Sequence, residues 1–159
     1  MNDFPRYVKN SIVEMTEYVF PNDTNQMGNL YGGRLMHWLD ICAAISASRH
    51  SNRVCVTASV DEINFIHPIH AGEVVILRAA VNRVFHTSME VGVKVFSQNL
   101  LTGSLAHTNT AYFTFVSIDE NGHPVEVPQI IPESEEEKRR YNQALKRREI
   151  RLQHRQKRG

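Results

Sequence analysis

Apolar residues occupy nearly every position of one segment, residues 32–49, and this sets it apart from the rest of the chain. Its sequence, GGRLMHWLDICAAISASR, places Leu, Met, Trp, Ile and Ala on all sides of a helix. A helix that is apolar on every side has to be enclosed by other elements. The pattern therefore predicts a buried central helix.

β-branched and aromatic residues dominate the segments on either side of this helix. Residues 11–19 alternate imperfectly between apolar and polar positions, which favours a short strand. Further strands are predicted over residues 54–60, 73–85, 88–98 and 104–118. Their connections contain short turns, which favour antiparallel pairing of consecutive strands, and no βαβ repeat is present. We therefore expect an α+β domain in which a curved antiparallel sheet wraps one long central helix.

Charge divides the chain into two segments. The first 130 residues are mixed, whereas residues 133–137 are mostly acidic and basic residues dominate from Lys138 onward. Ser134 at the start, acidic residues in the first turn and arginines toward the end predict a C-terminal helix over residues 133–153. We expect a domain over residues 1–130 and a charged helical tail over 131–159. The tail is interpreted as a phosphate-attracting arm, an RNA or anionic-lipid patch or, as we favour, a solvated helix that packs on a neighbouring subunit.

Composition narrows the function classes. The formal net charge is +1, which gives no reason to expect a nucleic-acid partner. Cys42 and Cys55 are isolated, and no histidine or cysteine motif of a metal site occurs, so we expect a reducing cytoplasm and no metal. No apolar run approaches the roughly 18 residues that a membrane span needs, and residues 1–10 lack a signal core.

Asp40 is a carboxylate within the apolar helix, where loss of water has to be compensated. One interpretation is an ion pair or hydrogen bond with Arg34 or His37, since the three residues follow a three-residue spacing. The other is a carboxylate aimed into a cleft, where it activates a water or attacks a carbonyl. The sequence around the start of the helix favours the second interpretation.

Two features precede the helix. Gly32 and Gly33 stand at its start, where unpaired backbone N–H groups and the positive end of the dipole can hold an oxyanion, although a Gly-Gly pair by itself is more often a flexible turn. Asn25 lies in a loop rich in Asn and Asp, either as a turn former or as an amide that orients a water or donates to a carbonyl. The Gly-Gly pair together with Asp40, about two helical turns after Gly33, is more specific than either feature alone.

These residues resemble a known family. PNDTNQMGNLYGGRLMHWLD, which holds Asn25, Gly28, Gly32, Gly33 and Asp40 in order, is similar to the signature of cytosolic and bacterial acyl-CoA hydrolases of the hotdog superfamily. The likeness continues through VTASVDEINFIHPIHAGEVV and FHTSMEVGVKVFSQ and covers roughly residues 11–118. It implies the hotdog fold and the hydrolysis of medium- to long-chain fatty acyl-CoA to free fatty acid and coenzyme A.

The resemblance also implies roles for individual residues. Asn25 and Asp40 would be catalytic and would face each other across the interface of a homodimer, which would assemble further as a trimer of dimers. The Gly32 and Gly33 N–H groups would polarise the thioester carbonyl, while Asp40 activates water and Asn25 fixes its position; direct attack by Asp40 is the alternative. The Thr57 hydroxyl would bond the water or the carboxylate, unless it is only a β-branched strand residue.

Coenzyme A enters as part of the substrate, and no separate cofactor is expected. The resemblance places its contacts near Asn64, Phe65 and the turn His86-Thr87-Ser88, with Arg83 available for a phosphate. Two other functions stay open. One is a non-catalytic acyl-CoA sensor, and the other is an acyl-thioester dehydratase or hydratase, which would need a histidine paired with an acid.

Overall fold

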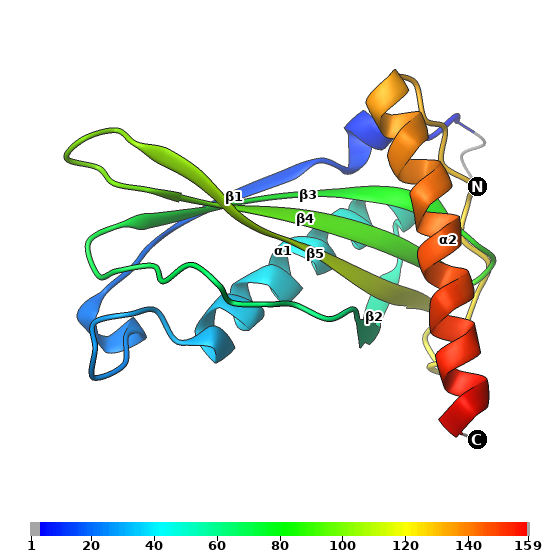
Figure 1. Ribbon diagram of the computed structural model, residues 1–159. Coiled ribbons are helices and arrows are strands. Elements are labelled where there is room, and N and C mark those ends of the chain that lie inside the picture. Colours follow the sequence, from blue (N-terminus) through cyan, green and yellow to red (C-terminus); the bar gives the residue numbers. More distant parts are fainter. Residues whose placement is uncertain (1–3, 159) are drawn as a thin grey trace.

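The computed structural model describes residues 4–158, which form one antiparallel five-stranded sheet with a long helix on each face (Figure 1). The strands are β1 (Val13–Tyr18), β2 (Val54–Val60), β3 (Val74–Val84), β4 (Ser88–Gln98) and β5 (Leu105–Ile118), and the helices are α1 (Gly32–Ser51) and α2 (Glu135–Arg158). Short 3-10 turns cover Val8–Ser11 and Pro21–Asp23. The predicted α+β arrangement, a curved sheet around one central helix with a second helix at the C-terminus, is confirmed.

The core lies between α1 and the inner face of the sheet. Leu39, Cys42 and Ala43 of α1 are fully buried, and they belong to one cluster with Phe113 and Phe115 of β5. However, Ile41 and Ile45 of α1 are 37% and 38% exposed. The sheet therefore encloses most of the predicted apolar helix, and one stripe of it stays uncovered in the single chain.

The sheet order is β1-β3-β4-β5-β2, which corrects one expectation. Consecutive strands pair in β3–β4 and β4–β5, but β2 pairs with β5 and not with β3. Both sides of β3 are already occupied, by β1 and β4. Residues 61–73 therefore are not a short turn but a crossover that takes the chain from β2, at one edge, to β3, which lies next to the opposite edge strand β1.

Strand β2 is an edge strand with little cover. Every residue except Cys55 is exposed, with Val54 at 66% and Val56 at 43%. Its pairing with β5 is interrupted between Thr57 and Ser59 by a register shift of the kind that a β-bulge produces. Within residues 4–158, no second strand pairs with the side of β2 that faces away from β5.

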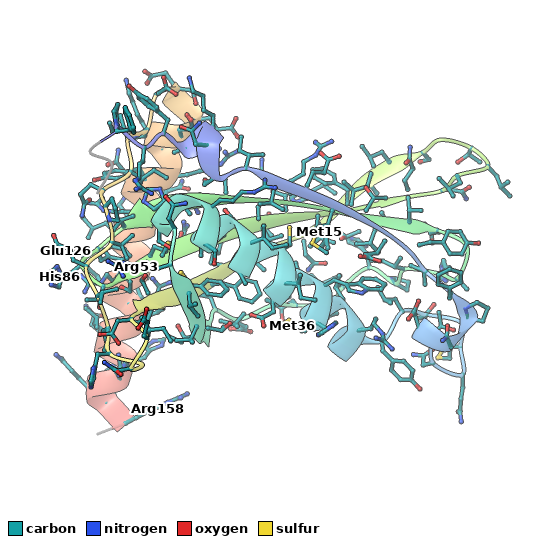
Figure 2. The ribbon with its side chains drawn as sticks, turned by 180° about the vertical axis from the view of Figure 1, so that it is seen from behind. Met15, Met36, Arg53, His86, Glu126 and Arg158 are labelled. Atoms are coloured by element: carbon teal, nitrogen blue, oxygen red, sulfur yellow. The ribbon has the colours of Figure 1, made fainter. Side chains whose placement is uncertain are left out.

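Helix α2 lies on the outer face of the sheet, opposite α1; Figure 2, seen from behind, has α1 in front of the sheet and α2 beyond it. Arg147 contacts the fully buried Glu90 of β4 through Nε at 3.0 Å and Nη2 at 2.7 Å. Burial opposes charge on this guanidinium, yet its hydrogen bonds and attraction to Glu90 raise the pKa of Arg147. The tail therefore packs on its own sheet, and its expected contact with a neighbouring subunit stays a prediction. The boundary at residue 130 stays a prediction.

Neither helix within residues 4–158 combines the length and the apolar character that crossing a bilayer requires. The cysteines Cys42 and Cys55 are both free thiols.

Replacement of Leu39 tests the packing of α1 on the sheet. Leu39→Ala should lower the free energy of unfolding by about 2–5 kcal/mol, because the side chain is fully buried and its removal leaves a cavity. Urea denaturation followed by circular dichroism measures this loss. Leu101→Ala is the control, since this side chain is 97% exposed in a turn and its loss should cost no more than about 0.5 kcal/mol. Equal losses of unfolding free energy for the two variants would contradict the burial of Leu39 between α1 and the sheet.

Candidate active site

Asp40 and Thr57 meet between α1 and β2. The Thr57 hydroxyl donates to Oδ1 of Asp40 at 2.6 Å, a length typical of a hydroxyl bonded to a carboxylate. Asp40 is half-buried, so this bond replaces part of the water that the carboxylate has lost. Arg34, the alternative partner, forms an ion pair with Asp23 at 3.2 Å. The geometry thus favours the interpretation of Thr57 as a partner of the carboxylate.

The start of α1 is open. Tyr31 precedes the helix without a side-chain cap, and its carbonyl accepts from the backbone N–H groups of Arg34 and Leu35. A Cβ added at Gly33 would have no heavy atom within 4 Å, so space lies beside its backbone. A Cβ at Gly32 would lie 3.5 Å from the Phe65 ring. The first N–H groups of the helix are therefore accessible, as an oxyanion site requires.

A cleft of about 360 Å³ adjoins this helix start. Gly32 and Phe65 line it together, and the crossover contributes more of its wall through Ile66 and Ile69. Asn109 of β5, which the sequence did not single out, also lines the cleft and donates to the backbone carbonyl of Asn64. Only long-range pairing brings Asn109 here, so no local sequence signal marks it.

Asn25 is held in its own loop, close to the start of α1. Its Oδ1 accepts from the backbone N–H groups of Met27 at 2.9 Å and Asn29 at 3.2 Å, and Gly28 takes the left-handed conformation, with φ 77°, that closes the turn. Within residues 4–158, the Asn25 side chain thus accepts hydrogen bonds through its oxygen, while its nitrogen is free. No hydrogen bond joins Asn25 to Asp40 in the described part of one chain.

The predicted coenzyme A contacts fall into two groups. Asn64 and Phe65 belong to the crossover beside the cleft, whereas the turn formed by His86, Thr87 and Ser88 joins β3 to β4 at the end of the sheet covered by α2 (Figure 2). The single chain therefore does not gather the two groups into one surface.

Arg83 contacts helix α2. Its Nη1 donates to the Tyr141 carbonyl at 3.2 Å, and its guanidinium lies 4.0 Å from the centroid of the Tyr141 ring. Helix α2 thus engages this arginine, because Tyr141 stacks on the planar cation. The phosphate contact stays a prediction, and it would have to compete with this stacking.

Comparison with known proteins agrees with the fold and shows the family of the chain. Residues 27–104 match the thioesterase superfamily. The chain is 46% identical over 142 residues to a Bacillus subtilis protein named as an uncharacterised acyl-CoA thioester hydrolase, with 89% of this chain and 83% of that protein covered. A solved structure of a hexameric acyl-CoA thioesterase is 40% identical, with a TM-score of 0.90 over 95% of this chain and 96% of that one.

A third relative is the acyl-CoA hydrolase of Staphylococcus aureus, solved with butyryl coenzyme A, coenzyme A and coenzyme A disulfide. It is 34% identical, with a TM-score of 0.89 over 96% of this chain and 93% of that chain. Further structures of that enzyme each carry an alanine in place of one aspartate, one threonine or one asparagine. Those positions have the same order and spacing as Asn25, Asp40 and Thr57. This protein thus belongs to the hotdog-fold acyl-CoA thioester hydrolases of the thioesterase superfamily.

Proposed function

We propose that the protein hydrolyses medium- to long-chain fatty acyl-CoA to free fatty acid and coenzyme A, with Asp40 as the base that activates water. The observation that carries this proposal is the bond between Thr57 and Asp40 in a member of this family. The apolar side chains beside the helix start, among them Leu35, Ile66 and Ile69, support a fatty acyl chain as the group accommodated there.

The proposed site is shared between two copies of the chain. A rise of about 1.5 Å per residue places Gly33 roughly 10 Å from Asp40 along α1, whereas attacked carbonyl, water and base need to be in direct contact. Asn25 lies on the glycine side, since its loop is tied to the helix start by the bond from Tyr31 N–H to the Asp23 carbonyl. We therefore assign Asn25, Gly32 and Gly33 to one copy and Asp40 with Thr57 to the other.

Exposed apolar surface supports this assembly. The free edge of β2 carries Val54, Val56 and Val60, and α1 adds Ile41 and Ile45, all more than a third exposed. An unpaired edge with apolar side chains is the kind of surface that a second copy covers. A homodimer would bury this strip, and a trimer of such dimers would give the hexameric state of one relative.

In this mechanism Thr57 holds Oδ1 of Asp40, so Oδ2 is left to accept the proton of a water. The water oxygen attacks the thioester carbon, and the oxyanion is stabilised by N–H donors of the helix start and by the Asn25 amide. Collapse of the intermediate breaks the carbon–sulfur bond, and the thiolate takes the proton from Asp40. Attack by Asp40 itself, giving an anhydride, is the alternative route.

A dehydratase is less well supported. Such an enzyme would pair a histidine with an acid, but the recorded partner of Asp40 within residues 4–158 is the Thr57 hydroxyl, while His37 is exposed to solvent on α1.

The first test concerns the base. Asp40→Asn should reduce thiol release from palmitoyl-CoA by about 10²- to 10⁴-fold, because the amide cannot accept the water proton. Asn25→Ala should also reduce the rate while the protein still binds palmitoyl-CoA. Release is followed with a thiol reagent, with butyryl-CoA as the short-chain comparison. A wild-type protein that binds palmitoyl-CoA without releasing thiol would be a sensor instead.

Thr57 provides a graded test of the carboxylate's partner. Thr57→Ser keeps the hydroxyl and should retain most of the rate, whereas Thr57→Val keeps the shape and removes the donor. A hydrogen bond to a charged group contributes about 1.5–3 kcal/mol, so the valine variant should lose roughly tenfold or more in kcat. Equal rates for the serine and valine variants would show that the hydroxyl has no part in the reaction.

Mixing two inactive variants tests the shared site. A heterodimer of Asn25→Ala and Asp40→Asn subunits has one intact site, since the intact Asp40 and the intact Asn25 then come from different copies. Random reassortment of equal amounts should restore about a quarter of the wild-type activity, because half the dimers are mixed and each has one working site. The subunits are mixed in mild denaturant, refolded together and assayed. Mixtures as inactive as the separate variants would place both residues in one chain's site.

A further inference from the structure

Helices α1 and α2 lie on opposite faces of the sheet (Figure 1), and strand β2 together with the residue that follows it bonds to both helices. Thr57 bonds to Asp40 on α1, whereas Asp61 bonds to Arg151 on α2. In a regular strand residues four apart point to the same face. An irregularity between Thr57 and Asp61 is therefore required.

The register shift supplies it. Thr57 is opposite Phe115, a core residue on the α1 side, and Ser59 is opposite the next residue, Thr114, so Ala58 is an extra residue in β2. After the bulge the Asp61 N–H donates to the carbonyl of Tyr112, a residue whose ring lies 3.7 Å from the Arg147 guanidinium on the α2 side. The bulge thus changes the phase of the strand, as bulges near active sites do.

This register is weakly specified by β2 itself. The strand pairs on one side within the chain, and most of its side chains are exposed, so few buried contacts distinguish one register from the next. A slip of one residue would turn Thr57 away from α1 and leave Asp40 without its bond. A contact outside the strand has to hold the register.

The contact on the α2 side is suited to this. Arg151 Nη1 donates to both oxygens of Asp61, at 3.2 and 2.9 Å, and lies 3.4 Å from Oε2 of Glu90. The side chains of Arg151 and Asp61 are only 18% and 22% exposed, and Glu90 is fully buried. Arg147 and Asn82 fix Glu90 in turn. Such a partly buried, multiply bonded pair restricts geometry in a way that an exposed ion pair does not.

We propose that Arg151 and Asp61 are positioning residues, whose ion pair holds β2 in the register that keeps the Thr57 hydroxyl on Asp40. Helix α2 would then set the rate of a reaction whose reacting atoms it does not touch. The proposal rests on the hydrolytic function and on the role of Thr57 proposed above.

Kinetics on palmitoyl-CoA test the proposal. Arg151→Ala and Asp61→Asn should each lower kcat by about 10- to 100-fold with KM little changed, because misplacement of a catalytic group affects the chemical step. Arg151→Lys should recover much of the loss, since it keeps the charge. Arg155→Ala, which removes an exposed arginine one turn further along α2, is the matched control and should leave kcat unchanged.

The double variant separates positioning from general destabilisation. In a Thr57→Val background the Arg151→Ala change should cause no further loss of kcat, because the bond that the ion pair protects is already gone. Losses that multiply, or an unchanged kcat for both Arg151→Ala and Asp61→Asn, would overturn the proposal.

Amide hydrogen exchange gives a readout independent of activity. Arg151→Ala should speed exchange in β2, at residues 57–60, while the central strand β4 keeps its protection. Unchanged exchange in β2 would overturn the proposal. A wild-type protein that releases no thiol would defeat the hydrolytic function instead, and the exchange comparison would still decide whether α2 holds β2.

Discussion

The structure depends on a carboxylate in the middle of an enclosed helix. Helix α1 is packed against the sheet through fully buried side chains such as Leu39 and Ala43. Asp40 lies between these two residues, directly after Leu39. A carboxylate at the edge of such a core needs a hydrogen-bond donor, and Thr57 supplies one at 2.6 Å. This bond ties the helix to β2. The placement of that edge strand is therefore part of the chemistry as well as part of the fold.

Edge strands usually have their register fixed by side chains that they bury, but β2 buries little in the single chain. Two groups of contacts compensate for this. On the outer face, Arg151 bonds to Asp61 just beyond the strand and also to the buried Glu90 of β4. On the free edge, the exposed valines provide a surface for a second copy, which in our account also brings Asn25 toward Asp40. Assembly and catalysis thus depend on the same strand.

The sequence predicted those parts of the fold that leave a local pattern. Residues 32–49 predicted a buried helix because their apolar side chains cover more than one face of a helix. The strands were predicted from their β-branched residues and from alternation of apolar and polar positions. The pairing of β2 with β5 was missed, because local periodicity contains no information on which distant strand is a neighbour. The placement of α2 on its own sheet was missed for the same reason, since its partner Glu90 lies 57 residues before Arg147.

Of the candidate site, the sequence alone singled out only part. Asp40 stood out as a charge in an apolar helix, whereas the roles of Asn25 and Thr57 came from the resemblance. The phosphate contact of Arg83 stays a prediction, and no local pattern indicated that Tyr141, far along the chain, stacks on this arginine. A signal for the network under α2 did exist: Arg147 and Arg151 are one helical turn apart, and Glu90 is an acid among the valines of β4. Neither the arginine pair nor the isolated acid identifies the other without the three-dimensional fold.

The central claim is that two copies of the chain converge on one thioester. A crystal structure with a non-hydrolysable acyl-CoA analogue tests it most directly. We expect the carbonyl of the analogue to lie within hydrogen-bond reach of Asn25 or the helix start of one copy, with Asp40 of the other copy across from it. A carbonyl bound away from Asp40, or contacted by Asn25 and Asp40 of the same copy, would contradict it.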